Sequence, residues 1–158
     1  MTDFMLTTTS FKDGDTLPFE QIYKGHGCDG GNTSPDLKWE NAPEDTKSFA
    51  IIMHDPDAPV KNGWYHWIVL NIPKETTSLE KGQKIKSPMF ETMTSFNETG
   101  YGGACPPIGH GVHHYNFKVY ALDCVFDNSI KSKPPVEIEK EVESHSLASA
   151  KVTAIYQR

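Results

Sequence analysis

Short hydrophobic segments separated by proline and glycine run through the first two thirds of the chain. Residues 48–55 are almost continuously apolar and end in a proline-rich polar turn, and residues 64–73 are aromatic and β-branched. Residues 115–123 alternate more weakly between apolar and polar positions. Segments of this length, bounded by turn residues, are typical of strands. We therefore predict three strands in these ranges.

The end of the chain has a different pattern. After Pro134 and Pro135, residues 136–158 contain neither proline nor glycine and are rich in Glu, Ala and Lys. Ser144 suits a helix N-cap, and residues follow it at helical spacing: Leu147, Ala148, Lys151, Val152, Ile155 and Tyr156. This pattern predicts one or two C-terminal helices. Residues 25–35 and 98–111 are loops by composition, and with no repeat or linker in view the whole of 1–158 is predicted to be one domain.

Composition and net charge limit the classes of partner that the chain is expected to bind. Hydrophobic residues make up 37% and charged residues 23%, which is typical of a soluble globular chain. The net charge of −6 argues against nucleic acid and against anionic membrane surfaces. No apolar run approaches the roughly 20 residues of a membrane helix, so membrane insertion is not expected. Any anion site must then be local, made of backbone N–H groups and histidines.

The cysteines and the N-terminus bear on location and cofactors. The three cysteines, Cys28, Cys105 and Cys124, are odd in number and far apart, which favours free thiols over a disulfide framework. The first ten residues lack the pattern of a signal peptide. We therefore expect a cytoplasmic protein. A GxGxxG match at 25–30 is not followed by a helical pattern, and no metal-ligand spacing such as HExxH occurs, so no cofactor and no metal are predicted.

The first candidate for chemistry is Asp-Pro-Asp-Ala-Pro at 55–59, directly after the first predicted strand. Pro56 restricts its own φ and biases Asp55 towards extended geometry. Asp55 and Asp57 could then accept hydrogen bonds, orient a histidine or ligate a metal. The alternative is a plain turn in which both carboxylates cap backbone N–H groups.

The second candidate is His66, which lies between tryptophans in the second predicted strand. Alternation places Trp64, His66 and Ile68 on one face. A short connection from the preceding turn would bring His66 near Asp55 or Asp57. The alternative is a histidine whose hydrogen bonds are satisfied in the core.

The third candidate is the segment 102–115. Gly102 and Gly103 would let backbone N–H groups form a nest for an anion, and two prolines stiffen the loop. His113 and His114 enter a strand and should point to opposite sides. The alternative is a rigid loop with incidental histidines. A Cys-His-Asp triad using Cys105 is disfavoured, because a cysteine before two prolines lacks the helix N-terminus that often activates such a thiol.

Taken in order, these motifs resemble the phosphatidylethanolamine-binding protein family, and in particular its bacterial branch, which is described as similar to Raf kinase inhibitor proteins. The matching segments are Gly31–Pro35 with Leu37 and Trp39, Asp55–Pro59, Gly63 to Trp67, Asn71–Pro73, Gly103–Tyr115 and Ser144–Ala150. They cover nearly the whole chain. Two positions depart from the family pattern: Ala104 stands in place of proline, and His114 replaces an arginine, which removes a permanent charge.

The resemblance implies packed antiparallel β-sheets with Greek-key links, peripheral helices, and a small pocket for phosphate, other small anions or phosphorylated head groups. It also implies the ligand-binding residues: Asp55, Asp57, Ala58, Trp64, His66, Gly103, Cys105, Pro106, Pro107, His113 and Tyr115. No activated nucleophile is visible, so binding without catalysis is expected. Two alternatives stay open, a protein–protein regulator of a kinase type and a metal- or histidine-assisted hydrolase using Asp55, Asp57, His66 and His113. A protein partner and a homodimer also stay open.

The residues suggest how such a pocket would work. We expect backbone amides near Gly103 and the Tyr115 hydroxyl to donate hydrogen bonds to the anion. His66 and His113 would add donors, and positive charge below about pH 6.5. Asp55 and Asp57 would orient the histidines and raise their basicity.

Overall fold

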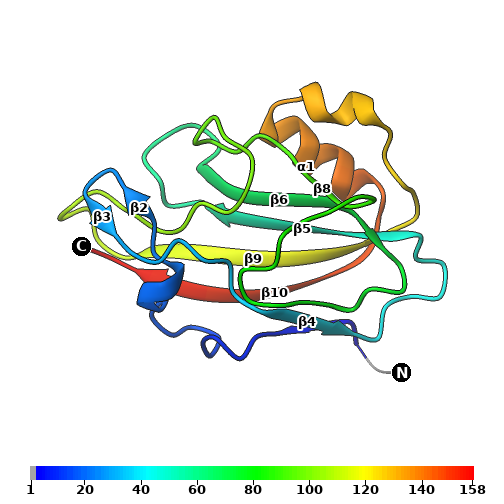
Figure 1. The fold of residues 1–158 in the computed structure, drawn as a ribbon, viewed down its shortest axis with the longest axis horizontal. Helices are drawn as coiled ribbons and strands as arrows, with labels where there is room; N and C mark the ends of the chain where they lie inside the picture. Colours follow the sequence, from blue (N-terminus) through cyan, green and yellow to red (C-terminus); the bar gives the residue numbers. More distant parts are fainter. Residues whose placement is uncertain (1–2) are drawn as a thin grey trace.

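The computed structural model describes residues 3–158, which are built around an antiparallel sheet of five strands in the order β10-β9-β5-β6-β8 (Figure 1). The bounds are β5 Ser48–Asp55, β6 Trp64–Pro73, β8 Phe90–Glu91, β9 His113–Leu122 and β10 Ser146–Tyr156. The central strand β5 and its neighbour β9 are apolar at almost every buried position, as expected for strands covered on both faces.

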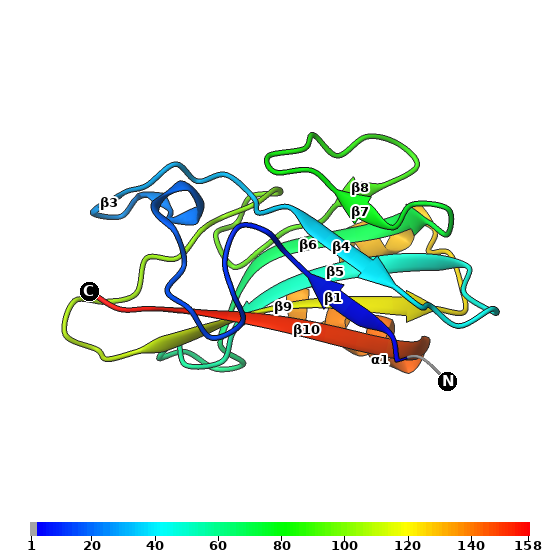
Figure 2. The ribbon, with the colours of Figure 1, turned by 90° about the horizontal axis from the view of Figure 1, so that it is seen from below.

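A smaller antiparallel sheet lies across one face of the larger one (Figure 2). Its strands are β1 Met5–Thr7, β4 Leu37–Glu40 and β7 Ser78–Leu79. The main core lies between the sheets and includes Trp39, Phe49, Trp67 and Phe117. This packing of two sheets is the architecture that the family resemblance implied, and the mainly β fold class is confirmed.

The helix α1, Pro135–Ser144, covers the other face of the large sheet. Its buried residues Ile138 and Val142 join a second core with Ile52, Ile68 and Tyr120. The remaining elements are the hairpin β2 Lys24–Gly25 and β3 Cys28–Asp29, and the 3-10 helices Phe19–Gln21 and Asn128–Ser132. No helix formed by residues 3–158 combines the length and apolarity needed to cross a lipid bilayer.

The prediction of a helix after Ser144 is wrong. Residues Ser146–Tyr156 form β10, which pairs with β9 from Ser146 opposite Leu122 to Tyr156 opposite His113. Helix α1 precedes it and begins at Pro135, a residue that suits the first turn because its missing N–H is not needed there. The apolar positions of β10 also fit a period of two, and pairing with β9 decides between the two periods.

The predicted strands 48–55 and 64–73 are confirmed, and the third begins two residues earlier, at His113. One detail of β6 differs from simple alternation. Met53 pairs with Trp67 and His54 with Tyr65, so His66 is an extra residue in a β-bulge. Ile68 consequently faces the helix side of the sheet, and the prediction that it shares a face with His66 is wrong.

Candidate functional site

A pocket of about 260 Å³ opens at the end of the large sheet where β5 ends and β6 and β9 begin. Two stretches distant in sequence meet there: the turn after β5 with the start of β6, and the loop before β9 with the start of that strand. Its lining residues are His26, Asp55, Ala58, Pro59, Val60, Trp64, His66, Phe96, Cys105, Pro106, Pro107, His113 and Tyr115. Nine of the eleven residues implied by the resemblance are among them, and Asp57 and Gly103 are not.

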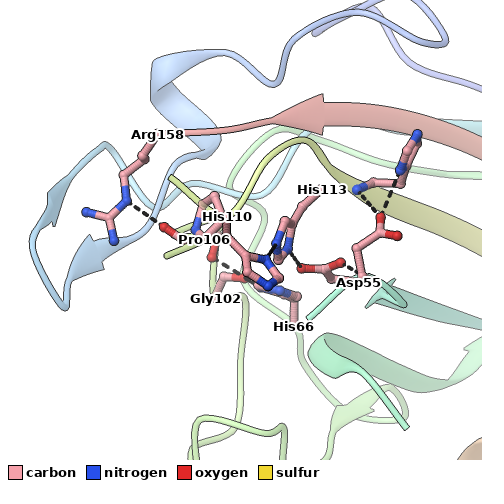
Figure 3. A network of polar contacts seen from close by, with 10 residues as sticks. Asp55, His66, Gly102, Pro106, His110, His113 and Arg158 are labelled. Carbon is pink, nitrogen blue, oxygen red and sulfur yellow. Dashed lines mark hydrogen bonds and ion pairs between the residues drawn. The ribbon is translucent and has the colours of Figure 1, made fainter. Parts of the chain in front are cut away.

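A buried carboxylate–imidazole pair forms the inner wall of the pocket (Figure 3). Asp55 is the last residue of β5 and His113 is the first residue of β9, and Asp55 Oδ2 lies 2.6 Å from His113 Nδ1. The other oxygen, Oδ1, accepts the Asp57 backbone N–H at 2.8 Å. The carboxylate therefore orients the imidazole, and His113 Nε2 is the nitrogen left to contact His110.

His110 extends this pair towards solvent. Its Nδ1 lies 2.7 Å from His113 Nε2, and the side chain is exposed (Figure 3). Sequence reasoning did not single it out. The loop turns back on His113 through Gly109 and Gly111, both of which have positive φ values that favour glycine. Asp55, His113 and His110 thus form one chain of polar contacts from the core to the surface.

His66 has different surroundings. Its Nδ1 donates to the carbonyls of Gly102 at 2.8 Å and Gly103 at 3.1 Å, so in the neutral ring Nε2 carries the lone pair. Burial lowers the pKa of His66 to about 4, even though the two carbonyl hydrogen bonds act in the opposite direction. The expectation that His66 supplies positive charge near pH 6.5 is therefore wrong.

In this loop, Gly102 and Gly103 allow close packing of the backbone. Gly103 N donates to Asn32 Oδ1 at 2.8 Å and Gly102 N donates to the His66 carbonyl at 2.9 Å, so neither amide is left for a ligand. The predicted anion nest at Gly103 is therefore wrong. A Cβ atom on Gly103 would lie 2.0 Å from the Gln21 carbonyl oxygen, so the position needs glycine because two backbone segments touch there.

Asp57 and His114 form a separate, exposed pair. Asp57 Oδ2 accepts from both the backbone N–H and Nδ1 of His114, each at 2.8 Å. Partial burial acts to raise the pKa of Asp57, but the hydrogen bonds from His114 outweigh it and lower that pKa. His113 and His114 thus point to opposite sides of β9, as predicted, and each is held by a different carboxylate.

Tyr115 and a set of apolar residues complete the walls. Burial, followed by the carboxylates of Asp55 and Asp57, raises the pKa of the Tyr115 phenol, so its hydroxyl keeps its proton. Phe96 meets the rings of Trp64 and His66 edge to face, with centroids 5.3 and 5.4 Å apart. Sequence reasoning missed Phe96, His26, Pro59 and Val60, because loop residues without periodicity give no sign of where they pack.

The pocket loop is also tied to other segments. Cys105 forms a disulfide with Cys28 in β3, and their Cα atoms lie 6.0 Å apart. The prediction of free thiols at these positions is wrong, because a separation of 77 residues hides their proximity in space. Structural disulfides are typical of oxidising compartments, so the argument from thiols for a cytoplasmic location no longer holds.

The residues beside the disulfide add backbone links. Ala104, which stands in place of the family's proline, is fully buried, and its carbonyl accepts from Tyr23 N at 3.0 Å. Arg158 Nε donates to the Pro106 carbonyl at 2.6 Å (Figure 3). Three segments therefore hold the loop that contributes Cys105, Pro106 and Pro107 to the pocket wall.

Comparison with known proteins agrees with this architecture. The family model described as phosphatidylethanolamine-binding protein matches residues 7–157. The chain is 38% identical to UPF0098 protein YbcL of Escherichia coli K12 over 98% of this chain and 87% of the relative, and 40% identical to UPF0098 protein YbhB over 96% and 98%. The crystal structure of E. coli YbcL superposes with a TM-score of 0.94 at 37% identity, covering 99% of both chains. The chain therefore belongs to the phosphatidylethanolamine-binding protein family.

Proposed function

We propose that the pocket binds a small ligand through a singly protonated oxyanion group, such as the phosphate of a phosphate monoester in its monoanionic form. The observation that carries this proposal is the pocket wall itself, in which the buried Asp55–His113 pair lies beside the Tyr115 hydroxyl and the neutral His66 ring. The description of the family as phosphatidylethanolamine-binding supports a phosphorylated ligand. A regulatory role would follow from ligand-dependent contacts with a protein partner.

The hydrogen-bond donors and acceptors of the pocket favour a ligand that both accepts and donates hydrogen bonds. The Tyr115 hydroxyl supplies a donor, and the neutral His66 ring presents an acceptor at Nε2. A fully ionised oxyanion has no proton to give to His66. A monoprotonated phosphate can donate one hydrogen bond while its other oxygens accept.

The charge in the pocket wall also favours a monoanion over a dianion. Asp55 lies in the pocket wall and would repel a dianion more strongly than a monoanion. Trp64, Phe96, Pro106 and Pro107 exclude water from these contacts, which strengthens them.

Calorimetry with methyl phosphate and with sulfate tests the proposal. The two ions are similar in size, but a phosphate monoester gains a proton below about pH 6 and sulfate does not. Because the monoanionic fraction of a phosphate monoester rises roughly 90-fold between pH 8 and pH 5, we expect methyl phosphate to bind at least about tenfold more tightly at pH 5 than at pH 8. At pH 5 we expect sulfate to bind measurably more weakly than methyl phosphate. Equal affinity for the two ions at pH 5 would contradict the role of His66 as an acceptor.

Two variants locate the binding. Tyr115→Phe keeps the buried ring and removes the hydroxyl, so it should weaken methyl phosphate binding while the far-ultraviolet circular dichroism stays unchanged. His114→Gln, on the opposite side of β9, is the matched control and should bind like the unmodified chain. Undiminished binding by Tyr115→Phe would place the ligand elsewhere.

A further inference from the structure

A second cluster of reactive side chains lies at the opposite end of β9 from the pocket. Asp123 and Cys124 directly follow β9, and His145 lies between α1 and β10. A carboxylate oxygen, the thiol sulfur and an imidazole nitrogen from these three residues all lie within 4.8 Å of one another. We propose that Asp123, Cys124 and His145 form a binding site for a divalent transition-metal ion of the Zn²⁺ class.

The ligand types and spacing suit such an ion. Thiolate, imidazole and carboxylate are the side chains that bind Zn²⁺, usually in a tetrahedron with bonds of about 2.0–2.3 Å. Neighbouring ligand atoms in that tetrahedron are roughly 3.3–3.6 Å apart. Asp123 Oδ1 and His145 Nδ1 already lie 2.9 Å apart, so an ion can enter between them after they separate by a few tenths of an ångström. Three protein ligands leave a fourth position for water.

The backbone that carries the ligands is already held in place. The Cys124 carbonyl accepts from Ser48 Oγ at 2.6 Å, and Asp123 N donates to the His145 carbonyl at 3.0 Å. Two residues further on, Phe126 exchanges a pair of hydrogen bonds with the side chain of Asn71, at 2.8 and 2.9 Å. Metal binding therefore requires only side-chain rotation, and little ordering of the chain opposes it.

The local charges favour a cation. The carboxylates of Asp123 and Glu141 both place negative charge near the Cys124 sulfur. The carbonyl end of α1 is next to His145, and helix C-termini attract positive charge. Lys133 offsets part of this field through its ion pair with Glu141.

Titration with Co²⁺ tests the proposal, because cobalt replaces zinc in such sites and bonding to a thiolate gives a charge-transfer absorption band in the near ultraviolet. Two of the three cysteines form the disulfide, so this band reports on Cys124 alone. We expect the band to appear with one equivalent of Co²⁺ on the oxidised protein and to disappear when Zn²⁺ is added. No band at saturating Co²⁺ would overturn the proposal.

Three variants separate a built site from a lone thiol. Cys124→Ser should abolish the band, and His145→Gln should weaken Co²⁺ binding at least about tenfold, because even supporting contacts around a metal are worth that much. His114→Gln is the matched control, since it removes a histidine that pairs with Asp57 at 2.8 Å but has no thiol in its cluster. Unchanged Co²⁺ affinity in a folded His145→Gln variant would overturn the site.

Discussion

The two ends of β9 carry the same kinds of side chain in different surroundings. At the start of the strand, the side chains of His113 and Asp55 are 2% and 4% exposed, and the nearby cysteine, Cys105, is in a disulfide. Beyond its end, the side chains of His145 and Asp123 are 40% and 50% exposed, and Cys124 is free. Because the first pair is buried, its side chains are held in one geometry, and the pocket forms around them. Exposure lets the second pair separate, which is what an entering metal ion requires.

The largest expected difference between the two pairs is in stability. Asp55→Ala leaves His113 without its partner in the interior, and breaking a buried pair in this way lowers the free energy of unfolding by about 3–5 kcal/mol. Asp123→Ala removes an exposed pair, for which the loss is about 0–1 kcal/mol. Urea denaturation of both variants at pH 7 measures the difference. Similar losses for the two variants would show that burial does not distinguish the pairs.

The pocket end also contains a histidine without a carboxylate partner, and this predicts a dependence on pH. Burial lowers the pKa of His66 from 6.5 to about 4, so the unfolded chain takes up this proton first as the pH falls. The free energy of unfolding should therefore decrease by about 3 kcal/mol between pH 6.5 and pH 4 on account of this residue, and stay level below pH 4, where both states are protonated.

The variant His66→Asn isolates this contribution, because its amide can still donate to the Gly102 carbonyl but does not titrate. Urea denaturation at pH 6.5 and at pH 4 should show a smaller decrease for the variant than for the unmodified chain. A decrease of the same size in both proteins would assign the acid sensitivity to other groups.

Most of the large sheet was predictable because its strands have strong local signals. The continuous apolar run of β5 and the aromatic, β-branched run of β6 point to buried strands whatever surrounds them. The segment of β10 lacks such a signal, since its small and apolar residues suit both helical and extended periods. Its pairing with β9 decides its structure, and a contact between segments is not visible in local spacing.

The pocket residues likewise divide into those that local sequence signals identify and those whose roles depend on contacts between distant segments. Asp55, His66, His113 and Tyr115 stood out because motif and residue type agree on them. His110 and Phe96 did not, because their roles depend on how loops fold back on the pocket. We predicted that the Gly103 amide would bind an anion, because a ligand can approach a glycine amide closely. In the structure this amide donates to the Asn32 side chain instead. Pairing of distant cysteines was likewise beyond what spacing reveals.

The cysteines at the two ends of β9 also differ, and this difference predicts a smaller change in the free energy of unfolding. The disulfide closes a loop between residues 77 apart, and losing a cross-link of this kind lowers the free energy of unfolding by about 2–4 kcal/mol, because the unfolded chain gains freedom. We expect this loss for the double substitution Cys28→Ser with Cys105→Ser, whereas Cys124→Ser should change the free energy of unfolding by less than about 1 kcal/mol. Urea denaturation with and without reductant measures both effects. Since reductant acts on the cross-link, it should destabilise the unmodified chain and Cys124→Ser and leave the double variant unchanged, and a double variant that still loses stability on reduction would contradict this assignment.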